Sequence, residues 1–176
     1  MFKKFKKDKA TTIEHGRGIL VFENTTEVIR SENTLKARGW EIKVMGPPPN
    51  IRTGCDLVIE FPLIEELSII RALEEVKVKP LQVLPVSENL LEPVNLIHEK
   101  EFGKYLMIRV ANMKITVDRD TKLIVNVSGG GCPDVPYLAE QMVDKKISEV
   151  QQPKDIGHTL CAYALQIAYD RMVELC

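Results

Sequence analysis

The chain has 176 residues, of which 44% are hydrophobic and 28% are charged, and its formal net charge is −1. These values fit a soluble globular protein that forms one domain or two small ones. They exclude the overall positive charge that is typical of nucleic-acid-binding proteins.

Residues 1–16 are predicted to form a basic flexible tail. Met1 to Ala10 contains five lysines and one aspartate. Phe2 and Phe5 lie among these lysines and could touch an anionic membrane surface or an acidic partner, but a solvated terminus is the simpler interpretation. No apolar segment follows, so we expect neither a signal peptide nor a transmembrane segment.

Residues 17–86 show the pattern β-α-β-β-α-β. Strands are predicted at 18–22, 40–44, 57–61 and 81–86, because apolar and polar residues alternate there or form short apolar runs. A helix begins after Asn24, with Glu27 completing a capping-box pattern, and stops at Gly39. A second helix is predicted at 63–77, with Pro62 as its first helical residue. The order is that of a ferredoxin-like domain.

Residues 87–104 are polar and lack a clean period, so they are predicted to be a linker. The remaining residues, 105–176, are predicted to form an α+β domain. Antiparallel strands occupy 105–127 with a turn at 118–122, one helix follows Cys132 to about Val143, and a second runs continuously from Asp155 to Leu175. The expected fold class is therefore α+β, with an antiparallel sheet and two C-terminal helices in the second half.

The most informative segment is the glycine-rich run from Ser128 to Asp134, between a predicted strand and a predicted helix. Glycines let the backbone approach a bound group closely, and a helix N-terminus favours a thiolate or a small anion. Cys132 is thus a candidate reactive thiol, and Ser128, Gly129, Gly130 and Gly131 are candidate anion-binding residues. The alternative is a strand-to-helix turn with an inert buried cysteine. Asp134 is interpreted as an acid at the helix N-terminus.

The four cysteines, Cys55, Cys132, Cys161 and Cys176, lie far apart in the sequence. This spacing argues against disulfides and for a reducing, cytoplasmic compartment. His158 and Cys161 are three residues apart on the predicted last helix, which makes them a conceivable metal pair, although a core or capping role is the simpler interpretation. His158 is also a candidate base for Cys132. We expect no metal and no cofactor.

A resemblance covers 18–86. Leu20-Val21-Phe22, the helix with Glu32, the stretch Leu35 to Gly39 and the loop Pro48-Pro49-Asn50-Ile51-Arg52-Thr53-Gly54-Cys55 resemble a family of anaerobe-associated selenium or sulfur carrier-like domains, also called DUF3343. The resemblance implies a ferredoxin-like fold and a working thiol at Cys55. Arg52 is a candidate positive neighbour of that thiol and opposes Asp56, whose charge disfavours a thiolate.

These observations predict an accessory protein, rather than an enzyme, that carries or relays sulfur or selenium on Cys55 and Cys132. Its expected partner is a sulfurtransferase or a maturing enzyme, and homo-oligomerisation is left open. Two alternatives remain. One is an assembly or maturation factor that binds a protein partner with no working cysteine, and the other is an enzyme that binds a small anionic substrate at the glycine-rich loop.

Overall fold

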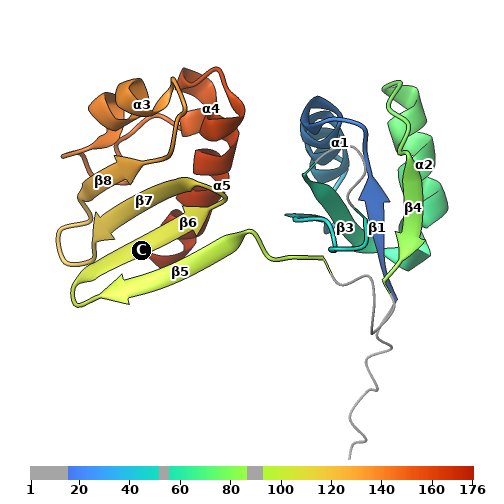
Figure 1. Cartoon of the computed structure of the whole chain (residues 1–176), viewed down its shortest axis with the longest axis horizontal. Helices are drawn as coiled ribbons and strands as arrows, with labels where there is room; N and C mark the ends of the chain where they lie inside the picture. The colour runs from blue at the N-terminus through green and yellow to red at the C-terminus, as the bar shows by residue number, and fades with distance from the viewer. Residues whose placement is uncertain (1–15, 52–55, 87–92) are drawn as a thin grey trace, which may run out of the picture. The chain divides into compact units, whose positions relative to one another are not determined.

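The computed structural model describes residues 16–51, 56–86 and 93–176 (Figure 1). The chain divides into two compact units, Met1–Pro93 and Val94–Cys176, and each is described by itself. The predicted basic tail up to residue 15, Arg52 and Cys55 of the first loop, and the linker residues 87–92 lie outside the described residues. No helix in the described ranges is both long and apolar enough to cross a membrane.

The first unit is an antiparallel sheet with two α-helices. Its strands follow the order β2-β3-β1-β4, and each neighbouring pair is antiparallel. Because β3 lies between β1 and β2, the first β-α-β unit is split as in a ferredoxin-like fold, and the predicted fold is confirmed. The elements are β1 Arg17–Val21, α1 Thr25–Ala37, β2 Lys43–Met45, β3 Val58–Pro62, the 3-10 helix η1 Leu63–Glu65, α2 Glu66–Glu75 and β4 Gln82–Pro85.

Local sequence signals explain the ends of α1. Asn24 Oδ1 accepts the backbone N–H of Glu27 at 3.0 Å, and Glu27 Oε2 accepts the N–H of Glu23 at 3.2 Å. This confirms the predicted cap and leaves fewer unpaired N–H groups in the first turn. Gly39 follows the helix with a φ of 85°, a conformation that glycine adopts without strain. Pro62 ends β3 and caps η1, so it is not the first helical residue that the sequence predicts.

Alternation along the strands separates two apolar faces of this sheet. Leu20 and Ile59 are fully buried in the cluster that also contains Val28 and Leu35 of α1 and Leu73 of α2. A smaller cluster on the opposite face consists of Ile19, Val21, Ile51 and Val58. The strands therefore bury both faces, as their nearly continuous apolar sequence allows.

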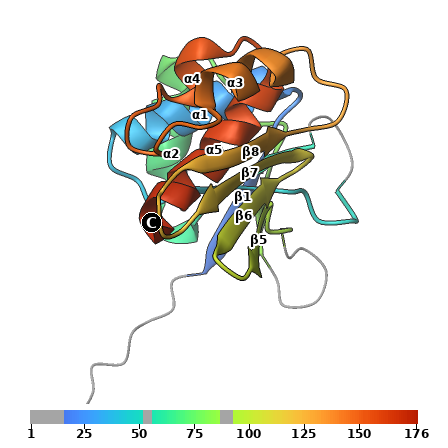
Figure 2. The same cartoon turned by 90° about the vertical axis from the view of Figure 1, so that its left-hand side faces the viewer.

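The second unit is a four-stranded antiparallel meander in the order β5-β6-β7-β8. Helix α5 packs against β6 and β7, and α3 packs against β8 (Figure 2). The core includes Ile108, Ile115, Leu138 and Leu165, each with no exposed surface. The elements are β5 Ile97–Phe102, β6 Tyr105–Val110, β7 Met113–Asp118, β8 Ile124–Ser128, α3 Val135–Met142, α4 Pro153–Ile156 and α5 Leu160–Leu175.

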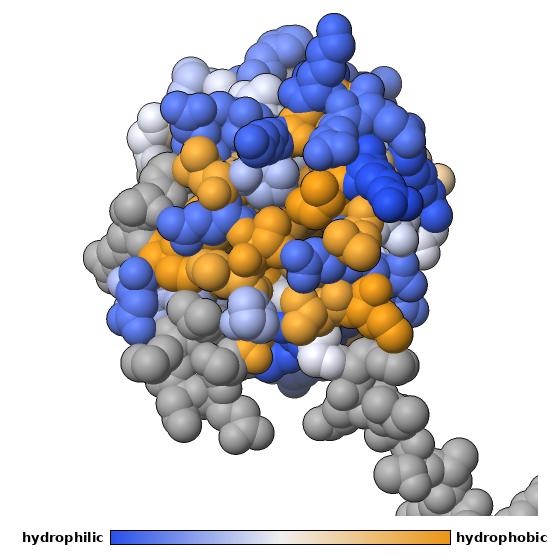
Figure 3. All heavy atoms as spheres, turned by 90° about the vertical axis from the view of Figure 1, so that its right-hand side faces the viewer, coloured by the Kyte–Doolittle hydropathy of each residue, from blue (hydrophilic) through white to orange (hydrophobic). Residues whose placement is uncertain are grey.

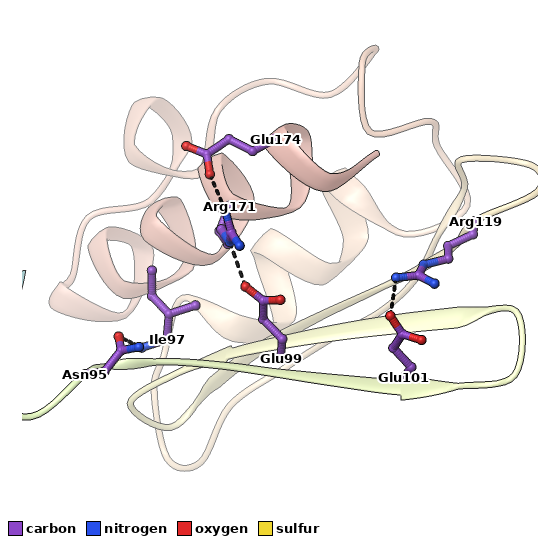
Figure 4. Close-up of polar contacts among 7 residues, drawn as sticks. All are labelled: Asn95, Ile97, Glu99, Glu101, Arg119, Arg171 and Glu174. Carbon is purple, nitrogen blue, oxygen red and sulfur yellow. Dashed lines mark hydrogen bonds and ion pairs between the residues drawn. The ribbon is translucent and has the colours of Figure 1, made fainter. Parts of the chain in front are cut away.

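Strand β5 lies within the segment 87–104 that the sequence predicts as a linker. Five of its six residues are exposed, so the strand lacks the apolar alternation by which strands are recognised. It is an edge strand, held by hydrogen bonds to β6 and by ion pairs (Figure 4). Glu99 pairs with Arg171 of α5 at 2.7 Å, and Glu101 pairs with Arg119 at 2.5 Å. Its charged side chains also fit the usual protection of an exposed edge.

The prediction of one continuous helix over 155–175 is wrong. The chain forms the short α4, leaves helical geometry at residues 157–159, and starts again as α5. Gly157 has an extended backbone, and Thr159 caps α5 by accepting the N–H of Cys161 at 3.3 Å. The apolar periodicity continues through the break, which is why the sequence pattern did not show it.

Candidate functional site

The glycine-rich loop leads from β8 to α3, as predicted, and two of its glycines are structurally required. A Cβ on Gly129 would lie 2.3 Å from Met113 Sδ, and Gly131 has a φ of 70°. Asn112 Nδ2 donates to the carbonyl oxygen of Gly130 at 3.0 Å and ties the loop to the β6–β7 turn. The loop thus turns away from the sheet and presents Cys132, which is half-buried, ahead of α3.

Cys132 is joined to Cys161 by a disulfide, with the two Cα atoms 6.5 Å apart. The expectation of no disulfide is therefore wrong for this pair. A sequence separation of 29 residues hid their proximity, which arises because α5 begins beside the glycine-rich loop. Cys161 was predicted to be a core or capping residue rather than the partner of Cys132. The signal that the sequence offered was Thr159, a preferred N-cap residue, which predicts that a helix begins just before Cys161.

Asp134 holds the loop against the start of α5. Its Oδ2 atom accepts the backbone N–H groups of His158 at 2.8 Å and Thr159 at 2.7 Å. Asp134 lies at the N-terminal end of α3, as predicted, but its carboxylate caps the entry to α5 rather than α3. Hydrogen bonding from the Thr159 side chain, reinforced by these two N–H groups, lowers the pKa of Asp134 against the opposing effect of desolvation.

Thr159 contacts both cysteines of the pair. Its Oγ1 atom lies 3.1 Å from Cys132 Sγ and accepts the backbone N–H of Cys161. The single hydroxyl proton is donated to Asp134, so Thr159 accepts from the Cys161 amide and meets Cys132 Sγ as a close contact. We call Cys132, Asp134, Thr159 and Cys161 the dithiol site.

The other predicted site residues contribute no side-chain contact to the dithiol site among the contacts described above. His158 is exposed and precedes α5, so it does not share a helical face with Cys161 as predicted. Its role as a base for Cys132 stays a prediction. Ser128 Oγ accepts a hydrogen bond from Asn126 Nδ2 at 3.1 Å, and anion binding by the loop is also untested. Cys176 is exposed and not in a disulfide. Across the described ranges, no three His, Cys, Asp or Glu residues gather in a way that could hold a metal ion.

The first unit exposes a group of apolar side chains near α2. Ile64 and Leu67 at the start of the helix are 69% and 73% exposed, and Leu81 before β4 is 53% exposed. Figure 3 views the side of the molecule on which α2 lies and shows apolar side chains gathered there among charged ones. We call Ile64 of η1 and Leu67 of α2, three residues apart, the α2 patch; Leu81 lies toward the other end of the sheet, where Gln82 pairs with Val21.

Fold and site together define an α+β protein in which a ferredoxin-like unit precedes a meander unit with a dithiol site. Residues 17–85 match the family model described as "Putative Se/S carrier protein-like", which confirms the resemblance of the first half. Residues 96–176 match DUF8182, a domain of unknown function.

One relative matches the sequence across both halves of the chain. A protein of Methanocaldococcus jannaschii, named "Uncharacterized protein MJ0011", is 46% identical over 163 residues, covering 91% of this chain and 82% of the relative. The chain belongs to the same family as this archaeal protein. No solved structure matches the chain.

Proposed function

We propose that this protein is an accessory factor in sulfur or selenium handling that carries or relays the chalcogen on cysteine thiols. The observation that carries the proposal is the dithiol site in a chain whose other unit matches a carrier-like family. Cys132 and Cys161 are both half-buried; Cys132 Sγ contacts the Thr159 hydroxyl, and Cys161 packs against the edge of the apolar core. Such a pair remains accessible to thiol chemistry, in contrast to cysteines packed in an apolar core.

The chemistry requires the reduced protein. A thiolate of the carrier attacks the outer sulfur of a donor persulfide, which leaves a persulfide on the carrier and a thiolate on the donor. The disulfide between Cys132 and Cys161 therefore has to be opened by an external dithiol before Cys132 can be loaded. The nearby N-terminus of α5 favours a thiolate here, whereas the carboxylate of Asp134 opposes it.

Cys55 is the second proposed carrier thiol. It lies in the part of the family match that falls outside the described residues, and Arg52 is its proposed positive neighbour. In a relay, one of Cys55 and Cys132 would receive sulfur and the other would deliver it. The partner would be a cytoplasmic sulfurtransferase or a maturing enzyme, which exchanges sulfur with an exposed thiol.

The test is persulfide formation on the full-length protein. The protein is reduced with a dithiol, freed of reductant, incubated with a cysteine desulfurase and cysteine, and analysed by intact-mass spectrometry and peptide mapping. We expect either a gain of one sulfur atom on Cys55 or Cys132 or, where Cys161 then displaces the sulfur from Cys132, a newly formed Cys132–Cys161 disulfide, and the C55S/C132S double variant should show neither. C176S is the matched control and should load as the wild type does. Equal loading of the double variant and the wild type would refute the carrier.

A second candidate function is supported by the α2 patch. Ile64 and Leu67 are two large apolar side chains, three residues apart, that are each more than two-thirds exposed, and exposed apolar patches are typical of protein-binding surfaces. An assembly factor that binds through this surface would tolerate serine at all four cysteines but lose its partner on Leu67→Glu. Co-purification of partners with the quadruple cysteine variant and with L67E therefore separates this function from that of a sulfur carrier.

A further inference from the structure

Hydrogen bonds that do not involve sulfur link the two segments that carry the thiols of the dithiol site. Asp134 bridges the loop that carries Cys132 to the residues that precede Cys161 by two backbone hydrogen bonds, neither of which involves sulfur. Thr159, which caps α5 and contacts Cys132, is fixed by the same carboxylate. These contacts do not depend on the disulfide, and a Cα separation of 6.5 Å lies within the range in which disulfides form.

Cys161 lies where its sulfur can attack the sulfur of Cys132. It lies in the first turn of the 16-residue helix α5, where the backbone N–H groups and the helix dipole favour a thiolate. The inner sulfur of a persulfide on Cys132 is the Cys132 Sγ atom itself. This is the atom that is bonded to Cys161 in the present disulfide. No other described cysteine has this relation to Cys132, because the remaining one, Cys176, ends α5.

We propose that Cys161 is the resolving thiol of this site and that the site reduces a persulfide on Cys132 to sulfide. The proposal rests on the proposed function, since it needs sulfur to reach Cys132. It assigns the reduction to the second unit and gives the pair a role beyond that of a passive carrier.

The step balances within the protein. The sulfur of Cys161 attacks the inner sulfur of the Cys132 persulfide, a new Cys132–Cys161 bond forms, and the bond to the outer sulfur breaks. The outer sulfur leaves with the bond's electron pair and takes the proton of the Cys161 thiol, so that it departs as hydrosulfide. The sulfane sulfur is reduced to sulfide while two cysteine thiols are oxidised to the disulfide seen in the structure. An external dithiol then reopens the pair and is itself oxidised.

The experiment follows one turnover on full-length protein. Dithiol-reduced wild type, C161S, C132S and the control C176S are each mixed with inorganic polysulfide in limiting amount and desalted. Peptide mapping after alkylation then locates persulfides and disulfides, and released sulfide is measured before and after a dithiol is added.

Wild type and C176S are expected to contain the Cys132–Cys161 disulfide and no persulfide on Cys132. C161S is expected to retain a persulfide on Cys132 and to release its sulfide only when the dithiol is added. A persulfide that persists on Cys132 to the same extent in wild type and C161S would overturn the resolving role while leaving the carrier intact. A persulfide that moves to Cys161 in the wild type would also overturn it.

Two further outcomes separate this inference from the function on which it rests. Loading on Cys55 but not on Cys132 of C161S would refute the resolving step and support a carrier confined to the first unit. Absence of persulfide from every cysteine in all four proteins would refute the carrier and the resolving step together. A desulfurase-driven loading of C161S repeats the test without polysulfide and guards against direct oxidation of the thiols.

Discussion

Gly157 shows how closely the backbone approaches the dithiol site. A Cβ at this position would lie 2.3 Å from Ala162 Cβ and 3.2 Å from Asp134 Oδ2. The residue also has an extended backbone that any side chain could adopt, so only the lack of space requires glycine. The turn between α4 and α5 therefore depends on the small volume of Gly157.

We expect Gly157→Ala to lower the free energy of unfolding by about 1–3 kcal/mol, the usual cost of forcing extra carbon into a packed region. Gly130→Ala is the matched control, because its Cβ would meet no atom within 4 Å, and it should change stability by less than about 0.5 kcal/mol. Urea unfolding of both variants measures the difference. Equal midpoints would mean that the turn can shift to accept the methyl group.

Asp134 is the residue that links the two cysteine-bearing segments through hydrogen bonds. Asp134→Ala should destabilise the protein by about 0.5–2 kcal/mol, the usual cost of losing a cap, since it leaves the partly exposed N–H groups of His158 and Thr159 without their protein acceptor. It should also lower the fraction of protein in which Cys132 and Cys161 are joined at a fixed ratio of reduced to oxidised dithiothreitol. Quantitative alkylation measures that fraction.

The control for Asp134→Ala is Asp155→Ala, at an exposed position of α4. It removes one carboxylate from the same region without touching the link between the segments. An unchanged redox equilibrium in D134A would show that the disulfide alone positions the two cysteines.

At the scale of elements, local signals predicted most of the fold but not the site. The capping box of α1 and the alternation in β1, β3, β6 and β7 depend on neighbouring residues, and sequence reasoning found them. Strand β5 was missed because an exposed edge strand has no apolar face. The pairing of Cys132 with Cys161 was missed because it depends on where α5 packs, which is a long-range property.

The end of β7 gives an element-scale test of electrostatics. Asp118 forms an ion pair with Lys104 at 2.7 Å and accepts the N–H of Asp120 at 3.0 Å and of Thr121 at 3.4 Å. The hydrogen bond from Lys104 is the largest of the causes that lower the pKa of Asp118 from its usual 3.8. A carboxylate with a lowered folded-state pKa stabilises the turn above the unfolded-state value.

That contribution should be lost as the pH falls from about 4 through the lower folded-state pKa of Asp118. We therefore expect the urea midpoint of Asp118→Asn to be lower than that of the wild type at pH 7 and the two midpoints to converge toward pH 3. Asp120→Asn, at an exposed neighbour, should follow the wild type across the same range. If the urea midpoints of D118N and the wild type differed by the same amount from pH 7 to pH 3, Asp118 would stabilise the protein through its shape rather than its charge.

At the scale of the whole molecule, each unit has its own core. The buried clusters of the first unit draw on residues 19–78, and that of the second draws on residues 106–172. Within the described ranges, neither set includes a residue of the other unit. The only tryptophan, Trp40, lies in the first unit, and all four tyrosines, at 105, 137, 163 and 169, lie in the second. Two optical signals thus report separately on the two units.

The disulfide closes a loop within the second unit alone, so its reduction should affect that unit alone. In the chain-entropy model, a cross-link over a separation of 29 residues stabilises by about 3–4 kcal/mol. We expect a dithiol reductant to lower the urea midpoint of the tyrosine near-ultraviolet signal and to leave the midpoint of Trp40 fluorescence unchanged. The C132S/C161S variant should match the reduced wild type with or without reductant, and C176S should match the wild type. If both signals moved together on reduction, the two units would unfold as one, and a change at the dithiol site would then be felt by the carrier-like unit as well.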